Sequence, residues 1–285
     1  MTDLEKIDKR LKAVYSVYND IKDNSYSVLS KKEFHFLISS INNIYGLRSL
    51  NNKFIQEFLV RNNLILPVKQ LDDIYSFPDR KYDIFDLVSI NSRSSFFSHY
   101  SAVYIHNLTE QIPKNIYLSY ERPNRADKKY TSLKQESIDV AFSKSPRVSS
   151  NFKKIDHYNV YYLNSQAYNK IGIEKFKKKY LVTDIERTLI DITIKPFYSG
   201  GVTQVLEAYN NSKEYLDVNK LLDYYIKMDF IYPYHQLIGF YLQRCNIDGY
   251  ELFKNFNMSL KFYLTYNILH SEYSEEWNII YPKGL

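Results

Sequence analysis

The stretch 180–192 constrains the fold of this chain more than any other. Its first three residues, Tyr-Leu-Val, predict a short buried strand. Thr183 and Glu186 follow with the spacing of a capping box, in which a hydroxyl and a carboxylate bond the free amides of a helix start. The helix behind this cap is amphipathic, and its apolar side is formed by Ile185, Leu189 and Ile192. A strand that runs directly into an amphipathic helix predicts an α/β fold.

The opposite side of this helix is charged. Asp184, Arg187 and Asp191 lie at positions i, i+3 and i+7, so acid and base alternate along one face. This alternation predicts an ion-pair network that orients the helix. Two alternatives are a partner-binding surface and a metal-dependent nuclease that uses Asp184, Glu186 and Asp191 near Lys195. Because Glu186 already serves the cap, we expect a structural role and no enzyme.

A glycine pair follows this helix. Pro196 limits the helix, and Gly200 and Gly201 predict a turn into a second amphipathic helix. We expect the structural motif of this region to comprise Thr183, Asp184, Glu186, Arg187, Asp191, Gly200 and Gly201. Beyond it the chain is predicted mostly helical, with Phe262–Leu264 and Trp277–Tyr281 as late strands that close the sheet.

The N-terminal 85 residues predict a small helical domain with a hairpin. Ser30 and Glu33 form a second capping box, and a further helix starts at Ser49. The apolar face of that helix is expected to be Leu50, Phe54, Ile55, Phe58 and Leu59. Strands at Leu64–Val68 and Tyr82–Phe85 would complete a winged helix-turn-helix.

In a winged helix-turn-helix the helix after Ser49 enters the major groove. Asn52 and Gln56 would then read base edges, while Lys53 and Arg61 would reach phosphates. The wing would present Lys69, Arg80 and Lys81.

Positive charge gathers in the middle of the chain. The formal net charge is +6, which divides into +1 over residues 1–113, +9 over 114–179 and −4 over 180–285. Strands are predicted at Ile112–Tyr120, Ile138–Phe142 and Asn159–Leu163. The loop after the first strand carries Arg122, Arg125, Lys128 and Lys129, which we expect to contact DNA phosphates.

Several classes of function lack their motifs. The sequence has no P-loop, no Gly-x-Gly-x-x-Gly and no His-Glu-x-x-His, so we expect no cofactor and no metal. His99 and His106 are predicted to cap or pack. One cysteine, Cys245, and the lack of an apolar run of membrane-spanning length or a signal peptide predict a cytoplasmic protein with no membrane partner.

Residues from about 80 to 285 resemble the AbiEi family of antitoxins. The resemblance rests on seven separated stretches in the family's order, among them VTDIERTLIDI at 182–192, the glycine pair, VLEAY at 205–209 and YPYHQLIGFYLQR at 232–244. The others are 96–108, 111–118 and the terminal YPKG.

This resemblance implies a larger C-terminal α/β domain over 86–285 behind an N-terminal DNA-binding domain over 1–85. It also implies an antitoxin of a type IV, or abortive-infection, toxin–antitoxin pair. Such a protein represses its own operon by binding operator DNA, as a monomer or as an oligomer formed on DNA. It counteracts a nucleotidyltransferase-type toxin encoded beside it.

Overall fold

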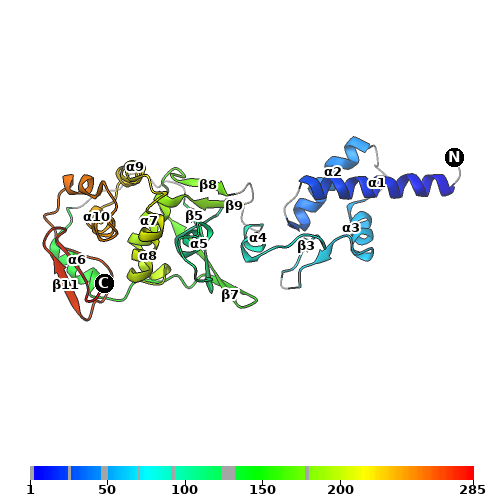
Figure 1. Cartoon of the computed structure of the whole chain (residues 1–285). Coiled ribbons are helices and arrows are strands. Elements are labelled where there is room, and N and C mark those ends of the chain that lie inside the picture. Colours follow the sequence, from blue (N-terminus) through cyan, green and yellow to red (C-terminus); the bar gives the residue numbers. More distant parts are fainter. Residues whose placement is uncertain are drawn as a thin grey trace. The chain divides into compact units, whose positions relative to one another are not determined.

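The computed structural model describes residues 3–24, 27–45, 51–69, 71–90, 94–122, 132–176 and 180–285 (Figure 1). The chain has the mixed α/β architecture that the sequence predicts. It divides into two compact units. Unit 1 comprises residues 1–93 with 177–180, and unit 2 comprises 94–176 with 181–285. The division after residue 93 lies a little beyond the boundary expected at 85.

Unit 1 is built from helices and a small antiparallel sheet. Its elements are α1 (Asp3–Asn24), β1 (Val28–Ser30), α2 (Lys31–Tyr45), α3 (Asn52–Arg61), β2 (Leu66–Pro67), β3 (Ile74–Ser76) and α4 (Ile84–Ser89). The strands pair in the order β1-β3-β2. The three long helices enclose a core of aliphatic and aromatic side chains, including Val17, Phe34, Ile38, Ile55 and Leu59. Burial of these side chains from several turns of helix is what stabilises so small a unit.

The predicted cap of α2 is confirmed, and the predicted second strand of the hairpin is wrong. Ser30 Oγ accepts from the Glu33 amide at 3.2 Å, and the Glu33 carboxylate accepts from the Ser30 amide at 3.0 Å. The partner of β2 is β3, which ends before Pro78. The segment predicted as a strand at Tyr82–Phe85 instead leads into α4, because Asp83 forms a capping box at its start.

The apolar face predicted for α3 is correct only in part. Ile55 and Leu59 are fully buried, whereas Phe54 is 51% exposed. Asn51, the residue before the helix, accepts from the Phe54 amide and sets the register of the first turn. This register directs the Phe54 ring to solvent. Leu50 and Ser49 lie outside the described residues.

Unit 2 is organised on a six-stranded mixed sheet in the order β6-β7-β5-β4-β9-β8. The strands are β4 (Phe96–Phe97), β5 (Asn115–Glu121), β6 (Phe152–Ile155), β7 (Tyr158–Ser165), β8 (Ile173–Phe176) and β9 (Tyr180–Thr183). β5 runs parallel to β7, and β4 runs parallel to β9. β4 pairs with β5 and β6 pairs with β7 in antiparallel fashion. The strands predicted near 112–120, 159–163 and 180–182 are thus β5, β7 and β9.

Two of the described helices of unit 2 lie between the strands of the sheet in sequence, and the others follow its last strand. The helices are α5 (His99–Ile105), α6 (Gln135–Phe142), α7 (Ile185–Ile194), η1 (Pro196–Tyr198), α8 (Val202–Ser212), α9 (Val218–Met228), α10 (Tyr234–Arg244) and η2 (Tyr250–Asn255). The strand predicted at Ile138–Phe142 is wrong, because these residues belong to α6. Ile138 and Phe142 are both buried, as residues four apart on one helix face are expected to be.

The late strands form a sheet of their own. β10 (Phe262–Tyr263), β11 (Ser271–Ser274) and β12 (Ile279–Pro282) pair in the order β10-β12-β11, so the prediction that they close the main sheet is wrong. β12 pairs in parallel fashion with β10 and in antiparallel fashion with β11.

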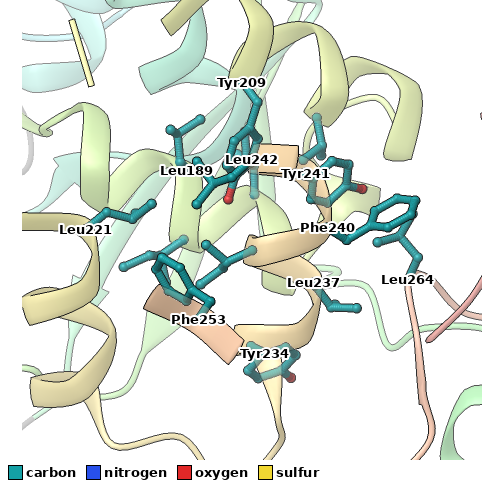
Figure 2. Packing of buried hydrophobic residues seen from close by; sticks show 14 of the residues in the cluster. Leu189, Tyr209, Leu221, Tyr234, Leu237, Phe240, Tyr241, Leu242, Phe253 and Leu264 are labelled. Atoms are coloured by element: carbon teal, nitrogen blue, oxygen red, sulfur yellow. The ribbon is translucent and has the colours of Figure 1, made fainter. Parts of the chain in front are cut away.

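The main core of unit 2 surrounds α10. Figure 2 shows Tyr241 and Leu242 of this helix beside Tyr209 of α8 and Leu189 of α7, and the rings of Tyr209 and Tyr241 stack with their centres 5.1 Å apart. Trp277, the single tryptophan of the chain, is fully buried in the same cluster. None of the described helices combines the length and apolar character that a membrane span needs.

Candidate functional site

The helix α7 is capped by Asp184 and not, as predicted, by Thr183. Asp184 Oδ1 accepts from the Arg187 amide at 2.9 Å. The Thr183 hydroxyl is buried and bonds the Thr188 hydroxyl at 2.7 Å instead. Gly172 is part of this arrangement, because its carbonyl accepts from the Asp184 amide at 2.7 Å. A Cβ on Gly172 would lie 2.5 Å from Arg187 Cβ, so only glycine fits there.

The carboxylates at the start of α7 fasten α9. Glu186 Oε1 accepts from the Asp217 amide at 3.0 Å, in place of the predicted bond back to residue 183. Lys220 Nζ lies 3.0 Å from Asp184 Oδ2 and 2.7 Å from Glu186 Oε2. Burial disfavours the ammonium, but the hydrogen bonds to both carboxylates outweigh it and raise the pKa of Lys220. Tyr224 donates its hydroxyl proton to Asp184 Oδ2 at 2.9 Å.

Arg187 is at the centre of unit 2 and is only 1% exposed. Its Nε donates to Asp191 Oδ1 at 2.9 Å, and its Nη1 donates to the Ile171 carbonyl at 2.8 Å. Glu121 Oε1 lies 3.7 Å from Nη1, and the guanidinium stacks 5.0 Å from the centre of the Tyr168 ring. Burial opposes the charge, but the neighbouring Asp191 carboxylate outweighs it and raises the pKa of Arg187.

The charged face of α7 therefore contains two separate groups. Asp184 and Glu186 share Lys220, whereas Asp191 pairs with Arg187. The predicted Arg187–Asp191 pair is present. The Asp184 carboxylate contacts Arg187 only by accepting from the backbone amide of Arg187. Among the described residues no group of three or more His, Cys, Asp or Glu side chains converges as a metal site would require. A metal shared by these three carboxylates would first have to displace Lys220 and Arg187.

A cavity of about 310 Å³ opens beside Arg187 and Asp191. Its polar lining includes His99, Ser119, Gln166 and Lys195. Its aromatic lining comprises Tyr168, Phe230, Tyr232 and Tyr234. Cavities of this size bind small organic ligands when a few polar groups converge in an apolar wall. The cavity is thus the candidate binding site of unit 2.

His99 is held in an unusual way at the wall of this cavity. It is the first residue of α5, it is 4% exposed, and its φ of 52° lies in the left-handed region that a bulky residue rarely adopts. Its Nδ1 is 2.8 Å from Ser98 Oγ, which in turn is 2.6 Å from Ser119 Oγ. Burial, with Lys195 and Arg187 nearby, lowers the pKa of His99 well below its usual value. The imidazole is therefore neutral at pH 7.

The two predicted histidines differ in what they do. His106 caps the end of α5 and bonds the Thr183 carbonyl at 2.6 Å, which agrees with the predicted capping or packing role. His99 packs against Tyr198 with its ring centre 5.3 Å away, but its Nε2 has no hydrogen-bond partner among the described residues. No local pattern distinguishes the two histidines, since both lie on apolar helical stretches.

The residues predicted to contact DNA in unit 1 fall into two sets. Asn52 donates to Ser39 Oγ at 3.0 Å, and Gln56 bonds His35 Nε2 at 2.9 Å and the Tyr75 hydroxyl. These amides tie α3 to α2 and β3, so both side chains already have hydrogen-bond partners within unit 1. The exposed set on α3 consists of Lys53 and Arg61.

The predicted wing residues are also separated. Lys69 is exposed in the β2–β3 connection, as expected of a wing. Arg80 and Lys81 lie beyond β3, because the hairpin ends at Ser76, and Arg80 stacks 5.2 Å from the centre of the Phe77 ring. Arg122 is exposed after β5. Arg125, Lys128 and Lys129 lie outside the described residues.

Gly200 and Gly201 form the predicted turn into α8, with φ values of 78° and 95°. Both values lie in the left-handed region, where glycine has no steric penalty. The turn places η1, and with it Tyr198, against the sheet residues Tyr117 and Leu163.

Comparison with known proteins identifies a fold and no family. No family model matches the sequence, and no curated protein matches it significantly. Among solved structures, the crystal structure of the RV2827C protein from Mycobacterium tuberculosis is similar, with a TM-score of 0.57 over 95% of this chain and 91% of that chain. The two sequences are 10% identical, so the likeness concerns the fold alone.

Proposed function

We propose that this chain is an antitoxin of a type IV toxin–antitoxin pair, which represses its own operon through unit 1 and counteracts a nucleotidyltransferase-type toxin. The order of elements in unit 1 carries the DNA-binding part of this proposal. A helix, a strand, two helices and a hairpin follow one another, and the three strands form one antiparallel sheet. This is the order expected of a winged helix-turn-helix. The sequence resemblance to AbiEi antitoxins supports the remainder.

In this proposal α3 is the recognition helix. Its inner side is fixed to α2 and β3 through Asn52 and Gln56, which gives the helix a defined orientation. Its exposed cations Lys53 and Arg61 are about two turns apart and would contact the phosphates on either side of a groove. Lys69 in the β2–β3 connection would contact the backbone beside them.

Fluorescence anisotropy tests operator binding. The probe is the DNA duplex upstream of the protein's own gene, compared with a scrambled duplex of equal composition. Lys53→Glu with Arg61→Glu should weaken binding and lower the slope of log affinity against log salt by about two ions, because each lost phosphate contact releases about one counterion less. The matched control is Lys9→Glu with Lys213→Glu, two exposed residues elsewhere, which changes the net charge equally.

Operator preference in the wild type, with the salt slope reduced only by the α3 variant, supports the proposal. Equal affinity for both duplexes, or equal slopes for the two variants, would contradict it. The antitoxin role is tested separately by co-expressing the chain with a nucleotidyltransferase encoded next to it. Restored growth is expected, and growth arrest that persists at high antitoxin expression would reject this role.

A further inference from the structure

The cavity beside Arg187 adjoins a second one in unit 2. This second cavity, of about 450 Å³, shares Ile194, Lys195 and Tyr234 with the first. Lys195 follows directly after α7, so its side chain contributes to both cavities. Any ligand that spans the two must pass this lysine.

The second cavity is positively charged. Lys144, Arg147 and Lys195 line it, and none of the described residues in its lining is an acid. Lys144 and Arg147 are exposed and form no ion pair with the described part of the chain. Lys195 is partly buried, and no carboxylate of the described residues lies within ion-pair distance of its ammonium. Lys144 and Arg147 have no ion-pair partner in the described part of the chain, and Lys195 has only the negative charge of Asp191 nearby. This excess of positive charge favours an anion with several oxygens, such as a phosphate chain.

The first cavity suits a planar ring. The aromatic side chains of Tyr168, Phe230, Tyr232 and Tyr234 line it, and His99, Ser119 and Gln166 supply hydrogen-bonding groups. His99 is almost wholly buried in the cavity wall, and its Nε2 has no partner in the described ranges. Asp191 adds a carboxylate acceptor. Aromatic faces with a few convergent donors and acceptors are what a nucleobase requires.

We propose that unit 2 binds a nucleotide across the two cavities, with the base in the aromatic cavity beside His99 and the phosphates on Lys195, Lys144 and Arg147. The strained backbone of His99 accords with this site, since left-handed non-glycine residues persist where a fixed side-chain position is needed. The proposal goes beyond operator binding and does not depend on it. The ligand is either a free nucleotide or the end of a single nucleic-acid strand, because both present the same base and phosphate.

Isothermal titration calorimetry tests the proposal on the full chain. The probes are ATP, GTP, CTP and UTP, the corresponding nucleosides, sodium tripolyphosphate and a short oligothymidylate. At least one nucleoside triphosphate should bind more tightly than both its nucleoside and tripolyphosphate, because only the nucleotide occupies both cavities. Binding of the oligonucleotide without any free nucleotide would assign the site to a strand end. Absence of heat for every nucleotide and for the oligonucleotide at millimolar concentration would overturn the proposal.

Two variants separate the phosphate and base contacts. Lys144→Ala with Arg147→Ala should weaken the binding of the nucleoside triphosphate by about ten-fold or more, since each substitution removes a charge-assisted contact. The matched control, Lys213→Ala with Lys283→Ala, removes two exposed lysines outside both cavities and should have no effect.

His99→Asn tests the base contact. Asparagine tolerates the left-handed backbone, so this variant should fold, which its thermal melting curve verifies. It should weaken nucleotide binding and leave tripolyphosphate binding unchanged. Nucleotide affinity that is unchanged in both the double variant and His99→Asn would reject the site even if the wild type binds nucleotides. Operator binding is measured without nucleotide, so its outcome is independent of this one.

Discussion

Replacement of Arg187 by alanine should destabilise unit 2 severely. The guanidinium is 1% exposed and bonds Asp191, while its Nη1 is shared between the Ile171 carbonyl and the Glu121 carboxylate. Its removal leaves the largely buried carboxylates of Asp191 and Glu121 without the cation that pairs with both. Glu121 Oε1 already has no hydrogen-bond partner in the described structure, so Arg187 is its main compensation.

The magnitude follows from the burial of this pair. Breaking a buried ion pair by removing one partner costs about 3–5 kcal/mol, because the other charge stays buried. For a unit of this size, 1 kcal/mol lowers the melting temperature by about 2–4 °C. Arg187→Ala should therefore melt roughly 6–20 °C below the wild type. Asp191→Asn should be milder, because the amide oxygen can still accept from Arg187 Nε.

Tryptophan fluorescence follows this transition, because Trp277 is the single tryptophan and is buried in unit 2. The control is Lys227→Ala, which breaks the exposed pair with Asp223 and should cost less than about 0.5 kcal/mol. A melting temperature of Arg187→Ala that equals that of this control would refute the scaffold argument.

The same melts test the alternative of a metal-dependent nuclease. The scaffold role expects no stabilisation of the wild type by magnesium or manganese and no cleavage of nucleic acid. The nuclease would be favoured if metal raises the melting temperature of the wild type and the wild type cleaves nucleic acid, while Asp191→Asn shows neither effect.

Three further predictions concern buried groups and the glycine turn. Burial lowers the pKa of His235 to about 4, and both ring nitrogens are bonded, to the Tyr225 hydroxyl and the Asn257 carbonyl. Since an unfolded histidine titrates near 6.5, the unfolded state binds the extra proton as pH falls from 6.5 towards 4. Stability should then decrease by about 3 kcal/mol across this window, and urea melts of His235→Gln should show a flatter pH dependence. Burial raises the pKa of the Cys245 thiol to about 11. Ellman's reagent at mildly alkaline pH should therefore react far more slowly with the native protein than with the urea-unfolded protein. Equal reaction rates would contradict the burial of this thiol. Gly200→Ala should cost about 1 kcal/mol or more in a fluorescence melt, because alanine is strained at a φ of 78°, and an unchanged melt would show that the turn adapts.

The local pattern of the sequence predicted the elements that are long or sharply bounded. β9, α7 and the glycine turn were all indicated by apolar periodicity and by turn residues. The cap of α7 was displaced by one residue, because Thr183 and Asp184 are both good capping residues. What decides between them is Tyr224 and Lys220, which bind the second oxygen of Asp184 from α9. That contact joins residues far apart in the chain and leaves no local signal.

Short apolar runs predict their secondary structure less well. Ile138–Phe142 alternates in a way that suits a strand, yet the buried residues at its two ends are four apart, as in one face of a helix. In Tyr82–Phe85 the spacing of Asp83 and Asp86 was a capping signal that outweighed the strand pattern. In both cases a run of four or five residues is too short for periodicity to separate helix from strand.

The cavity of unit 2 was beyond prediction from the sequence for a different reason. Its lining comes from α5, β5, the β7–β8 connection, α7 and the α9–α10 connection, which only the fold brings together. His99 was predicted to pack, because nothing in its neighbours announces a left-handed backbone or a free ring nitrogen. The hydrogen bonds that Asn52 and Gln56 form to α2 and β3 are likewise not predictable from the sequence, since polar helix residues have the same pattern whether they face solvent or a neighbouring element.

The two ends of α7 differ in how their charges are compensated, and this difference yields a last prediction. At the start of α7, Lys220 forms ion pairs with Asp184 and Glu186. At its end, Lys195 forms no ion pair with any described residue. Burial lowers the pKa of Lys195, although Asp191 opposes this. The helix dipole favours a cation here by only about 1 kcal/mol or less, so a partly buried ammonium without a direct ion pair is costly in the free protein. Lys195→Met keeps the apolar stem and removes the charge. It should raise the melting temperature of the free protein and abolish the stabilisation that a nucleoside triphosphate gives the wild type. A variant that melts lower than the wild type and still responds to the nucleotide would assign Lys195 to the scaffold instead.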